Sequence, residues 1–292
     1  MLRGMAWAAV LRRLDAYERL ARLDKPVGWL LLLWPTLWAL WLASEGWPRP
    51  EHFAIFVLGV ILMRSSGCAI NDWADRNFDP HVERTRTRPL AAGEITPGEA
   101  IAVGVFFALC AFALVLFLSR LAILLSFVAL AIAWSYPFAK RFFVLPQAWL
   151  GVAFGFGIPM AYAAVQGRLP AECGLLLAAN VCYSLGYDTE YAMVDRDDDA
   201  KLGLRTSALL FGRWDTVAVM ASYAGMLALL ALLGLARGFG LAYWAGLAAA
   251  ALAAAAHWPM IRTRSREGCF RAFRHANWIG AAVLAGIVVE LA

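Results

Sequence analysis

Three aspartates, Asp72, Asp75 and Asp79, follow a long apolar run and stand three and four residues apart. If a helix continues through them, this spacing puts the three carboxylates on one face. Crowded carboxylates repel one another and favour a bound cation, and oxygen ligands without His or Cys suit Mg²⁺. The stretch therefore predicts a divalent-cation site at the end of a helix.

A second acidic cluster lies far along the chain, where Asp195 and Asp199 stand four residues apart and Asp188 precedes Asp195 by seven. These intervals again put the carboxylates on one helical face. Because Mg²⁺ favours one or two carboxylates plus phosphate oxygens, two facing clusters would hold a diphosphate through bound ions. Solvated loop acids are the alternative for one cluster, but two clusters at helix ends favour a shared site.

Basic and amide side chains near these clusters are candidates for binding an anion. Arg64 lies two helical turns before Asn71, inside the apolar run, where an arginine is costly and usually faces a polar interior. We expect Arg64 and Asn71 to contact phosphate groups. Lys25, Arg76 and Lys201 are weaker candidates for the same contact. A structural ion pair is the alternative for Arg64.

The surrounding sequence is that of a polytopic membrane protein. Of its 292 residues, 62% are hydrophobic and 16% are charged, whereas an ordinary soluble domain has about 25% charged residues. A spanning helix needs about 20 apolar residues. Nine segments are long enough, and they are 27–44, 53–70, 98–118, 121–138, 144–166, 171–187, 214–236, 240–260 and 272–291. The pattern predicts an all-α fold with nine transmembrane helices.

Two local patterns refine this prediction. Gly151, Gly155, Gly157 and Pro159 predict close packing and a kink within the fifth segment. Residues 1–25 repeat apolar side chains at helical spacing with arginines between them, which predicts an amphipathic helix on the cytoplasmic membrane surface. Residues 26–292 are then expected to form a single transmembrane domain.

The Lys and Arg residues predict the orientation in the membrane. Of the 26, 21 lie in the N-terminal segment and in the loops after the second, fourth, sixth and eighth apolar segments. By the positive-inside rule the N-terminus is cytoplasmic, and nine spans place the C-terminus on the far side. Both acidic clusters then lie on the cytoplasmic face, where they can form one site.

The fourth segment ends in Tyr136-Pro137-Phe138-Ala139-Lys140-Arg141. Because a guanidinium binds a carboxylate through a fork of donors, Arg141, beside Lys140, is a candidate for binding a substrate carboxylate. The rings of Tyr136 and Tyr187 are candidates for contact with an aromatic substrate or a positive charge. Ordinary interfacial anchors are the alternative for these residues. The four His and five Cys residues show no metal-ligand spacing.

Several motifs together resemble the UbiA superfamily of intramembrane aromatic prenyltransferases, and its hydroxybenzoate branch in particular. They are Arg22-Leu23-Asp24-Lys25-Pro26, Asn71 to Asp79, Tyr136-Pro137 with Lys140-Arg141, and Tyr187-Asp188-Thr189 with Tyr191-Ala192-Met193-Val194-Asp195-Arg196-Asp197-Asp198-Asp199. The resemblance implies nine helices around a central cavity that opens sideways into the lipid. It also implies that Mg²⁺ and a polyprenyl diphosphate bind at Asp72, Asp75, Asp79, Asp195 and Asp199.

The implied reaction transfers a polyprenyl group from its diphosphate to the ring carbon ortho to the hydroxyl of 4-hydroxybenzoate, in ubiquinone synthesis. Asp188 or Asp195 would assist deprotonation of the phenol. Arg64 would stabilise the leaving group, and Arg141 would bind the benzoate carboxylate. The expected partners are the diphosphate, 4-hydroxybenzoate and membrane lipid, without nucleic acid, and the expected location is the bacterial inner membrane.

Other functions remain as alternatives. The first is prenylation of another acceptor, such as dihydroxynaphthoate, homogentisate or haem. The second is a cation transporter, which would need acids near midspan on several helices, whereas the spans here hold almost none. Soluble isoprenyl chain-elongation enzymes also use paired Asp-rich motifs, but nine spanning segments argue against that class.

Overall fold

The computed structural model describes residues 2–292, and within them the side chains of residues 2–6, 8, 9 and 140–142 lie outside the described set. Throughout the described range, regular structure is helical, which confirms the all-α prediction. The helices are α1 (Leu2–Ala21), α2 (Val27–Ser44), α3 (Pro50–Asp75), η1 (Asp79–His81), α4 (Pro97–Val115), α5 (Arg120–Phe142), α6 (Pro146–Gly155), α7 (Gly157–Gln166), α8 (Ala171–Val194), α9 (Arg196–Lys201), α10 (Ser207–Phe211), η2 (Gly212–Trp214), α11 (Asp215–Arg237), α12 (Leu241–Ala255), α13 (His257–Ile261) and α14 (Arg266–Glu290).

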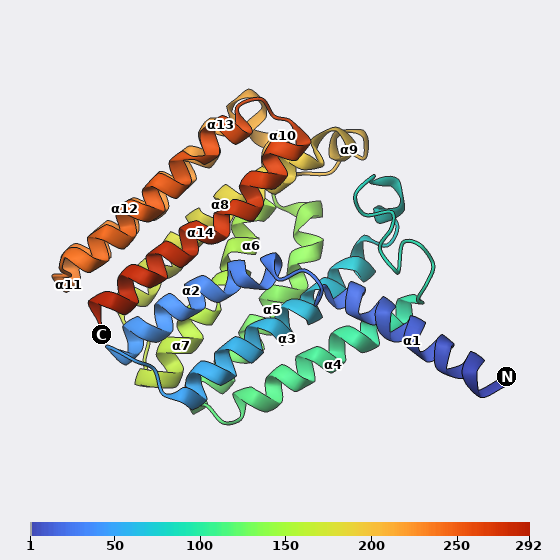
Figure 1. Cartoon of the computed structure of the whole chain (residues 1–292), viewed down its shortest axis with the longest axis horizontal. Coiled ribbons are helices and arrows are strands. Elements are labelled where there is room, and N and C mark those ends of the chain that lie inside the picture. The colour runs from blue at the N-terminus through green and yellow to red at the C-terminus, as the bar shows by residue number, and fades with distance from the viewer. Residues whose placement is uncertain (1) are drawn as a thin grey trace.

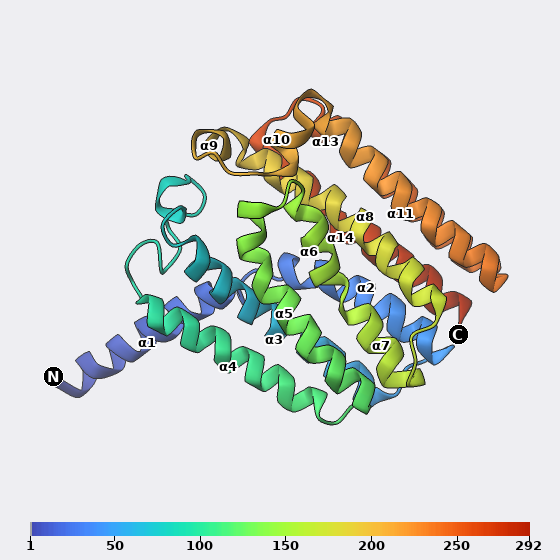
Figure 2. The ribbon, with the colours of Figure 1, turned by 180° about the vertical axis from the view of Figure 1, so that it is seen from behind.

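The long helices form a closed ring. Figure 1 shows α12, α14, α2, α3 and α4 side by side, and each contacts the next. Seen from behind in Figure 2, the return path runs through α5, α6, α8 and α11, which also contact one another in that order. Contacts of α4 with α5 and of α11 with α12 close the ring. Contacts of α8 with α14 cross this ring and divide it into two halves.

Buried aromatic side chains fasten the helices across the ring. The indole of Trp38 on α2 donates a hydrogen bond to the carbonyl of Gly280 at 2.9 Å, and the hydroxyl of Tyr183 on α8 donates to the carbonyl of Ala276 at 2.8 Å. Both rings are fully buried, so their polar atoms need these partners. The two bonds tie α2 and α8 to the backbone of α14.

Eight helical segments of the described range are long and apolar enough to cross a membrane, so the chain is a polytopic membrane protein. They are Val27–Ser44, Pro50–Asp75, Pro97–Val115, Arg120–Ala139, Pro146–Gln166, Ser207–Arg237, Leu241–Ile261 and Arg266–Glu290. The predicted count of nine is not confirmed. The predicted segment 171–187 forms α8, which has 24 residues, but Asn180, Asp188 and Glu190 lower its hydropathy.

The fifth predicted span breaks at Phe156 into α6 and α7, which confirms the predicted kink. A Cβ atom at Gly155 would lie 2.5 Å from Nδ2 of Asn180, and one at Gly157 would lie 2.3 Å from Oγ1 of Thr36. Both distances are too short for any larger residue, so the two glycines allow α8 and α2 to approach this segment.

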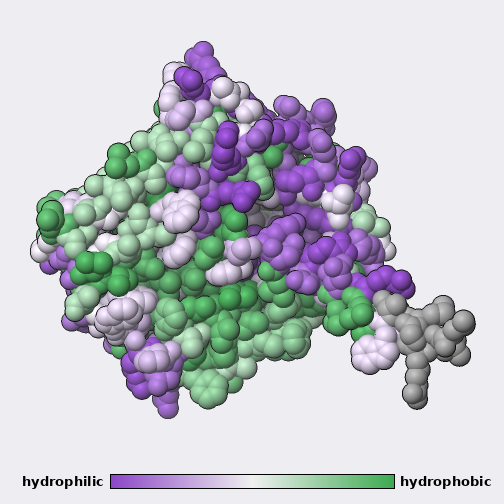
Figure 3. Space-filling view, viewed as in Figure 1, coloured by the Kyte–Doolittle hydropathy of each residue, from purple (hydrophilic) through white to green (hydrophobic). Residues whose placement is uncertain are grey.

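The surface divides by polarity. Figure 3 shows hydrophilic residues gathered over the side that carries α9 and the α3–α4 loop, while hydrophobic residues cover much of the helical body. The first helix, α1, lies beside this polar side, and the hydroxyl of its Tyr17 donates to Glu99 of α4 at 2.7 Å. Trp7, Leu11 and Leu14 of α1 are exposed. The structure thus contains the predicted N-terminal helix, whose placement on a membrane surface stays a prediction.

Candidate active site

A cavity of about 1010 Å³ lies inside the half of the ring formed by α2 to α8 and α14. One end is polar, and residues of both acidic clusters line it. From the first cluster these are Asn71, Asp75 and Asp79, and from the second they are Asp188, Asp195 and Asp199. The fold therefore brings two clusters that are far apart in the sequence to one cavity.

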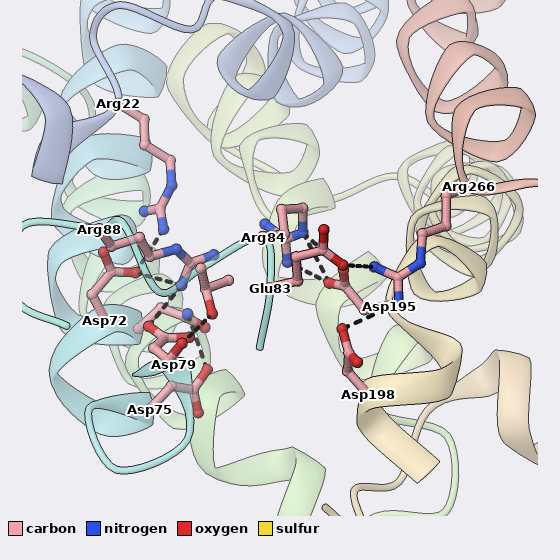
Figure 4. Close-up of polar contacts among 12 residues, drawn as sticks. Arg22, Asp72, Asp75, Asp79, Glu83, Arg84, Arg88, Asp195, Asp198 and Arg266 are labelled. Atoms are coloured by element: carbon pink, nitrogen blue, oxygen red, sulfur yellow. Dashed lines mark hydrogen bonds and ion pairs between the residues drawn. The ribbon is translucent and has the colours of Figure 1, made fainter. Parts of the chain in front are cut away.

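Two arginines cover the first cluster (Figure 4). Arg22 directly follows α1 in the left-handed conformation, with φ of 54°, and donates to Oδ1 of Asp72 at 2.6 Å. Arg88 from the α3–α4 loop donates to Oδ1 of Asp72 and to Oδ2 of Asp79, both at 2.9 Å. Asp72 is only 1% exposed, so these charged donors offset the cost of burying its carboxylate.

Asp75 and Asp79, the other two aspartates of this cluster, line the cavity. Asn71 donates from Nδ2 to Asp75 at 3.2 Å, which orients that carboxylate. Burial raises the pKa of Asp79 above its ordinary value, and the neighbouring Arg88 partly opposes that shift. A further cation near Asp79 would oppose that shift and favour the charged form of the carboxylate.

Arg84 connects the first region to the second cluster. Its guanidinium reaches from the α3–α4 loop and donates to both carboxylate oxygens of Asp195, at 2.5 to 3.1 Å. It also stacks over the ring of Tyr191, 4.5 Å from the centroid. Burial disfavours the charge of Arg84, but Tyr191 and Asp195 raise its pKa above the ordinary value, so the guanidinium stays charged.

A fourth arginine joins the segments over the polar end. Arg266, the first residue of α14, donates to Glu83 at 3.0 Å and to Asp198 at 3.3 Å, as Figure 4 shows. Glu83 belongs to the α3–α4 loop and Asp198 to α9. These pairs are partly exposed and individually weak, but together they hold both loops against α14.

Arg64 lies deeper in the cavity wall. Its guanidinium is 5.4 Å from the ring centroid of Phe154. Its buried Nε has no hydrogen-bond partner within the described part of the chain. A Cβ atom on Gly28 would lie 3.2 Å from this Nε, so Gly28 leaves room for the guanidinium. A buried donor that faces a cavity without a partner marks a place for an anionic or polar ligand.

The structure can be compared with every residue chosen from the sequence. The chosen residues that line the cavity are Lys25, Arg64, Asn71, Asp75, Asp79, Tyr136, Tyr187, Asp188, Asp195 and Asp199. Asp72, Arg76 and Lys201 are not among the lining residues: Asp72 is covered by arginines, and Arg76 and Lys201 are exposed. Lys140 and Arg141 lie outside the described side chains, so their roles stay predictions.

Sequence reasoning did not select four arginines that line the cavity, Arg19, Arg22, Arg84 and Arg88. Three of them belong to motifs already noted or to the loop directly after Asp79, so their closeness to the acidic residues was a usable signal. The sequence could not predict which arginine pairs with which aspartate, since Arg84 and Asp195 are 111 residues apart.

The acidic residues fit a hard divalent cation by donor type, because all of them offer carboxylate oxygen. Among the described residues, however, no three His, Cys, Asp or Glu side chains come together as one metal-binding group. The five predicted ligands are instead divided between the two sides of the cavity, with arginines bound to several of them. A cation shared with a diphosphate between the two sides matches this division.

The cavity has negative and positive groups at one end and an apolar space beyond them. The apolar walls come from several helices and include Leu32, Val60, Met63, Val115 and Phe154. Such a cavity suits a ligand with a highly charged head and a long hydrocarbon tail. Its walls also keep water from a reactive carbon.

Comparisons with known proteins agree with this geometry. The model of the UbiA prenyltransferase family matches residues 32–279. The chain is 59% identical over 280 residues to a 4-hydroxybenzoate octaprenyltransferase of Ralstonia nicotianae, with 96% of each chain covered. It is 60% identical over 278 residues to the protein of the same name from Thiobacillus denitrificans, with 95% of each covered.

Solved structures show the same fold. A UbiA homolog from Aeropyrum pernix is 28% identical, with a TM-score of 0.78 over 90% of this chain and 98% of that one. A UbiA homolog from Archaeoglobus fulgidus, solved with GPP and Mg²⁺, has a TM-score of 0.70 at 18% identity, over 93% and 99% of the two chains. At that identity the second likeness concerns the fold alone.

Proposed function

The chain belongs to the UbiA prenyltransferase family, and on that premise we propose that it transfers a polyprenyl group from a polyprenyl diphosphate to 4-hydroxybenzoate. The new bond joins the first prenyl carbon to the ring carbon ortho to the hydroxyl, and diphosphate is released. Relatives with 59% and 60% identity carry names that state this acceptor and an octaprenyl group. The product would serve ubiquinone biosynthesis.

One observation carries this proposal: a single cavity presents both acidic clusters and several arginines at one end and apolar walls beyond them. The charged end fits a diphosphate with a divalent cation. The apolar part fits an isoprenoid tail, whose burial contributes about 25 cal/mol per Å² of surface removed from water.

The polar end would activate the leaving group. When the allylic C–O bond breaks, its electron pair stays on the diphosphate and positive charge develops on the prenyl carbon. Arg64, with its unpartnered Nε, and Arg88 and Lys25 would stabilise the diphosphate charge. Bound Mg²⁺ would supply further charge stabilisation at the diphosphate oxygens. The residues proposed to hold it are Asp72, Asp75, Asp79, Asp195 and Asp199, and Asn71, Arg76 and Lys201 remain proposed diphosphate contacts.

The aromatic acceptor would bind beside α8. Asp188 or Asp195 would accept the phenol proton, which increases electron density at the ortho carbon. That carbon forms the new bond to the prenyl carbon, and its own proton then leaves to restore aromaticity. Tyr187 lines the cavity near both acids, and its hydroxyl is 2.9 Å from Oγ of Ser184. Its ring face would stabilise the transient positive charge.

The carboxylate of the acceptor would be bound from the end of α5. We assign this contact to Arg141 with Lys140, and ring contact to Tyr136, which lines the cavity. Arg141→Ala should raise the KM for 4-hydroxybenzoate about 10- to 100-fold, because a charged hydrogen bond contributes about 1.5–3 kcal/mol. The KM for the diphosphate should change little. Equal effects on both substrates would reject the assignment.

The orientation follows from the charge distribution. We propose the bacterial inner membrane, with the N-terminus and both acidic motifs in the cytoplasm, since 21 of 26 basic residues lie in the corresponding loops. Residues 1–25 would form a helix on that surface, and residues 26–292 a single transmembrane domain. The hydrophilic side seen in Figure 3 supports this arrangement.

The central experiment incubates membranes containing the protein with 4-hydroxybenzoate, Mg²⁺ and polyprenyl diphosphates, and identifies the product by mass spectrometry. The expected product is 3-polyprenyl-4-hydroxybenzoate, and EDTA should abolish its formation. Dihydroxynaphthoate and homogentisate are tested in parallel, because prenylation of one of these instead would assign a different acceptor. Full activity in EDTA would reject the metal-dependent mechanism.

A further inference from the structure

One helix, α3, runs along the full depth of the cavity. Its lining residues include a series at every fourth position, Ile55, Gly59, Met63, Gly67, Asn71 and Asp75, and Phe56, Val60 and Arg64 stand beside this series. At 1.5 Å per residue, Asp75 and Ile55 are about 30 Å apart along the helix axis. This length matches the hydrocarbon core of a bilayer, about 30 Å thick. Position along α3 therefore measures depth below the charged end.

The character of the wall changes with this depth. Asn71 and Asp75 form the charged end, and Arg64 is the deepest cation on α3. Beyond it the α3 lining is apolar, and α4 and α5 contribute the small residues Ala111, Ala129 and Ala133 beside the larger Val115. Small side chains at these positions leave the apolar part wide enough for a hydrocarbon chain.

Gly59 lies in this deep apolar part, next to open space in the cavity. A Cβ atom built on Gly59 meets no atom within 4 Å. Most other buried glycines of the bundle allow close packing; at Gly104 on α4, for example, a Cβ would lie 2.9 Å from Ile70. Glycine inside a helix costs about 1 kcal/mol relative to alanine. Since packing does not require glycine at position 59, the space that it leaves in the cavity is the remaining structural consequence.

We propose that Gly59 determines how long an isoprenoid tail the cavity accepts. The inference rests on the proposed prenyl transfer and concerns its donor. Gly59 is about 24 Å from Asp75 along α3, so a side chain there meets the distal part of a long tail. A short tail such as geranyl ends nearer the charged end and does not reach it. Gly59 is thus a specificity-determining residue that selects by volume rather than by charge.

Three glycine-to-leucine variants separate this role from other effects. Gly59→Leu adds bulk deep in the cavity. Gly67→Leu adds the same bulk between Arg64 and Asn71, where a Cβ also meets nothing within 4 Å. Gly174→Leu is the matched control, because Gly174 is exposed on α8, has the same open surroundings and does not line the cavity.

The measurement is kcat/KM with geranyl, farnesyl and octaprenyl diphosphate at saturating 4-hydroxybenzoate. For Gly59→Leu the octaprenyl-to-geranyl ratio should fall at least about tenfold, the discrimination expected from steric exclusion in an apolar pocket. Gly67→Leu should reduce kcat/KM for all three donors together. Gly174→Leu should match the wild type with every donor.

The outcomes are distinguishable. An unchanged octaprenyl-to-geranyl ratio in Gly59→Leu, or an equal loss with all donors, would overturn the inference while leaving prenyl transfer intact. If the wild type forms no product with any diphosphate, the proposed function itself fails. If Gly59→Leu does not accumulate in membranes, Gly59→Ala decides, because alanine favours the helix. The expected fall in its ratio is about two- to fivefold, and no fall would reject the role of Gly59.

Discussion

The two faces of α8 carry carboxylates in opposite situations. On one face Asp188 lines the cavity, and Asp195 follows at the end of the helix under the guanidinium of Arg84. On the other face Glu190 is fully buried away from the cavity. Its Oε1 is 2.6 Å from Nδ1 of His257, and its Oε2 accepts from the hydroxyl of Tyr223 at 3.1 Å.

The two sides differ in whether every buried polar atom has a hydrogen-bond partner within the protein. Both oxygens of Glu190 are bonded to side chains of neighbouring helices, and Nε2 of His257 in turn is 3.1 Å from His275. Such a closed network holds α8, α11, α13 and α14 together. The cavity side instead ends in groups such as the unpartnered Nε of Arg64. A buried acid whose oxygens are bonded to side chains of several helices stabilises the fold, whereas the unpartnered Nε of Arg64 beside the cavity can bind a ligand.

The largest effect is expected on the cavity side. Asp75→Asn and Asp195→Asn should each reduce kcat by about 10³-fold or more, because on the proposed mechanism they remove charge that stabilises the transition state through a bound metal ion. The melting temperature of Asp75→Asn in detergent should stay close to that of the wild type, whereas Asp195→Asn also weakens the buried pair with Arg84 and should lower it. Asp197→Asn is the matched control, since Asp197 is exposed in the same motif and does not line the cavity. A comparable loss in this control would contradict the assignment.

The next largest effect is expected on the stability of the protein, from a substitution on the face of α8 that is buried away from the cavity. Glu190→Ala leaves His257 and Tyr223 without their carboxylate, so the free energy of unfolding should fall by about 3 kcal/mol or more. Chemical denaturation in detergent measures this change. The kcat/KM of the folded fraction should remain within about threefold of the wild type. A large loss of activity at unchanged stability would show that Glu190 belongs to the reacting site, and the comparison would fail.

A smaller effect is expected for the arginines over the first cluster. Arg88→Ala removes a charged partner of Asp72 and Asp79, and should raise the KM for the diphosphate about 10- to 100-fold. Arg76→Ala is the comparison variant. Arg76 is exposed, donates to the carbonyl of Trp73 and stacks on its ring. A larger effect for Arg76 than for Arg88 would favour the assignment made from sequence alone.

The smallest effect is expected for Tyr223→Phe, which removes one hydrogen bond from the sealed network. Glu190 keeps its bond to His257, so the free energy of unfolding should fall by only about 1 kcal/mol. Activity should not change measurably. Thermal unfolding of this variant beside Glu190→Ala tests whether His257 or Tyr223 supplies most of the stabilisation, and equal losses would assign it to Tyr223.

Much of the fold could be predicted from the sequence, because the patterns that specify its helices are local. Apolar runs predicted the spanning helices, and Gly155 and Gly157 predicted the break between α6 and α7. The count of nine was not confirmed because α8 combines a spanning length with polar residues that serve the cavity and the sealed network. The four histidines showed no metal-ligand spacing, yet His257 proved to be a structural partner of Glu190 and of His275, which no local pattern indicates.

The amino-acid sequence by itself determined the helices, both acidic motifs and the likeness to the prenyltransferases, since these depend on residue types at short spacing. Only the tertiary structure decided which arginine covers which aspartate, which face of α8 is sealed, and how deep Gly59 lies below the charged end. The physical reason is that these properties depend on side chains from helices distant in the sequence, whose contacts are set by packing around the whole ring.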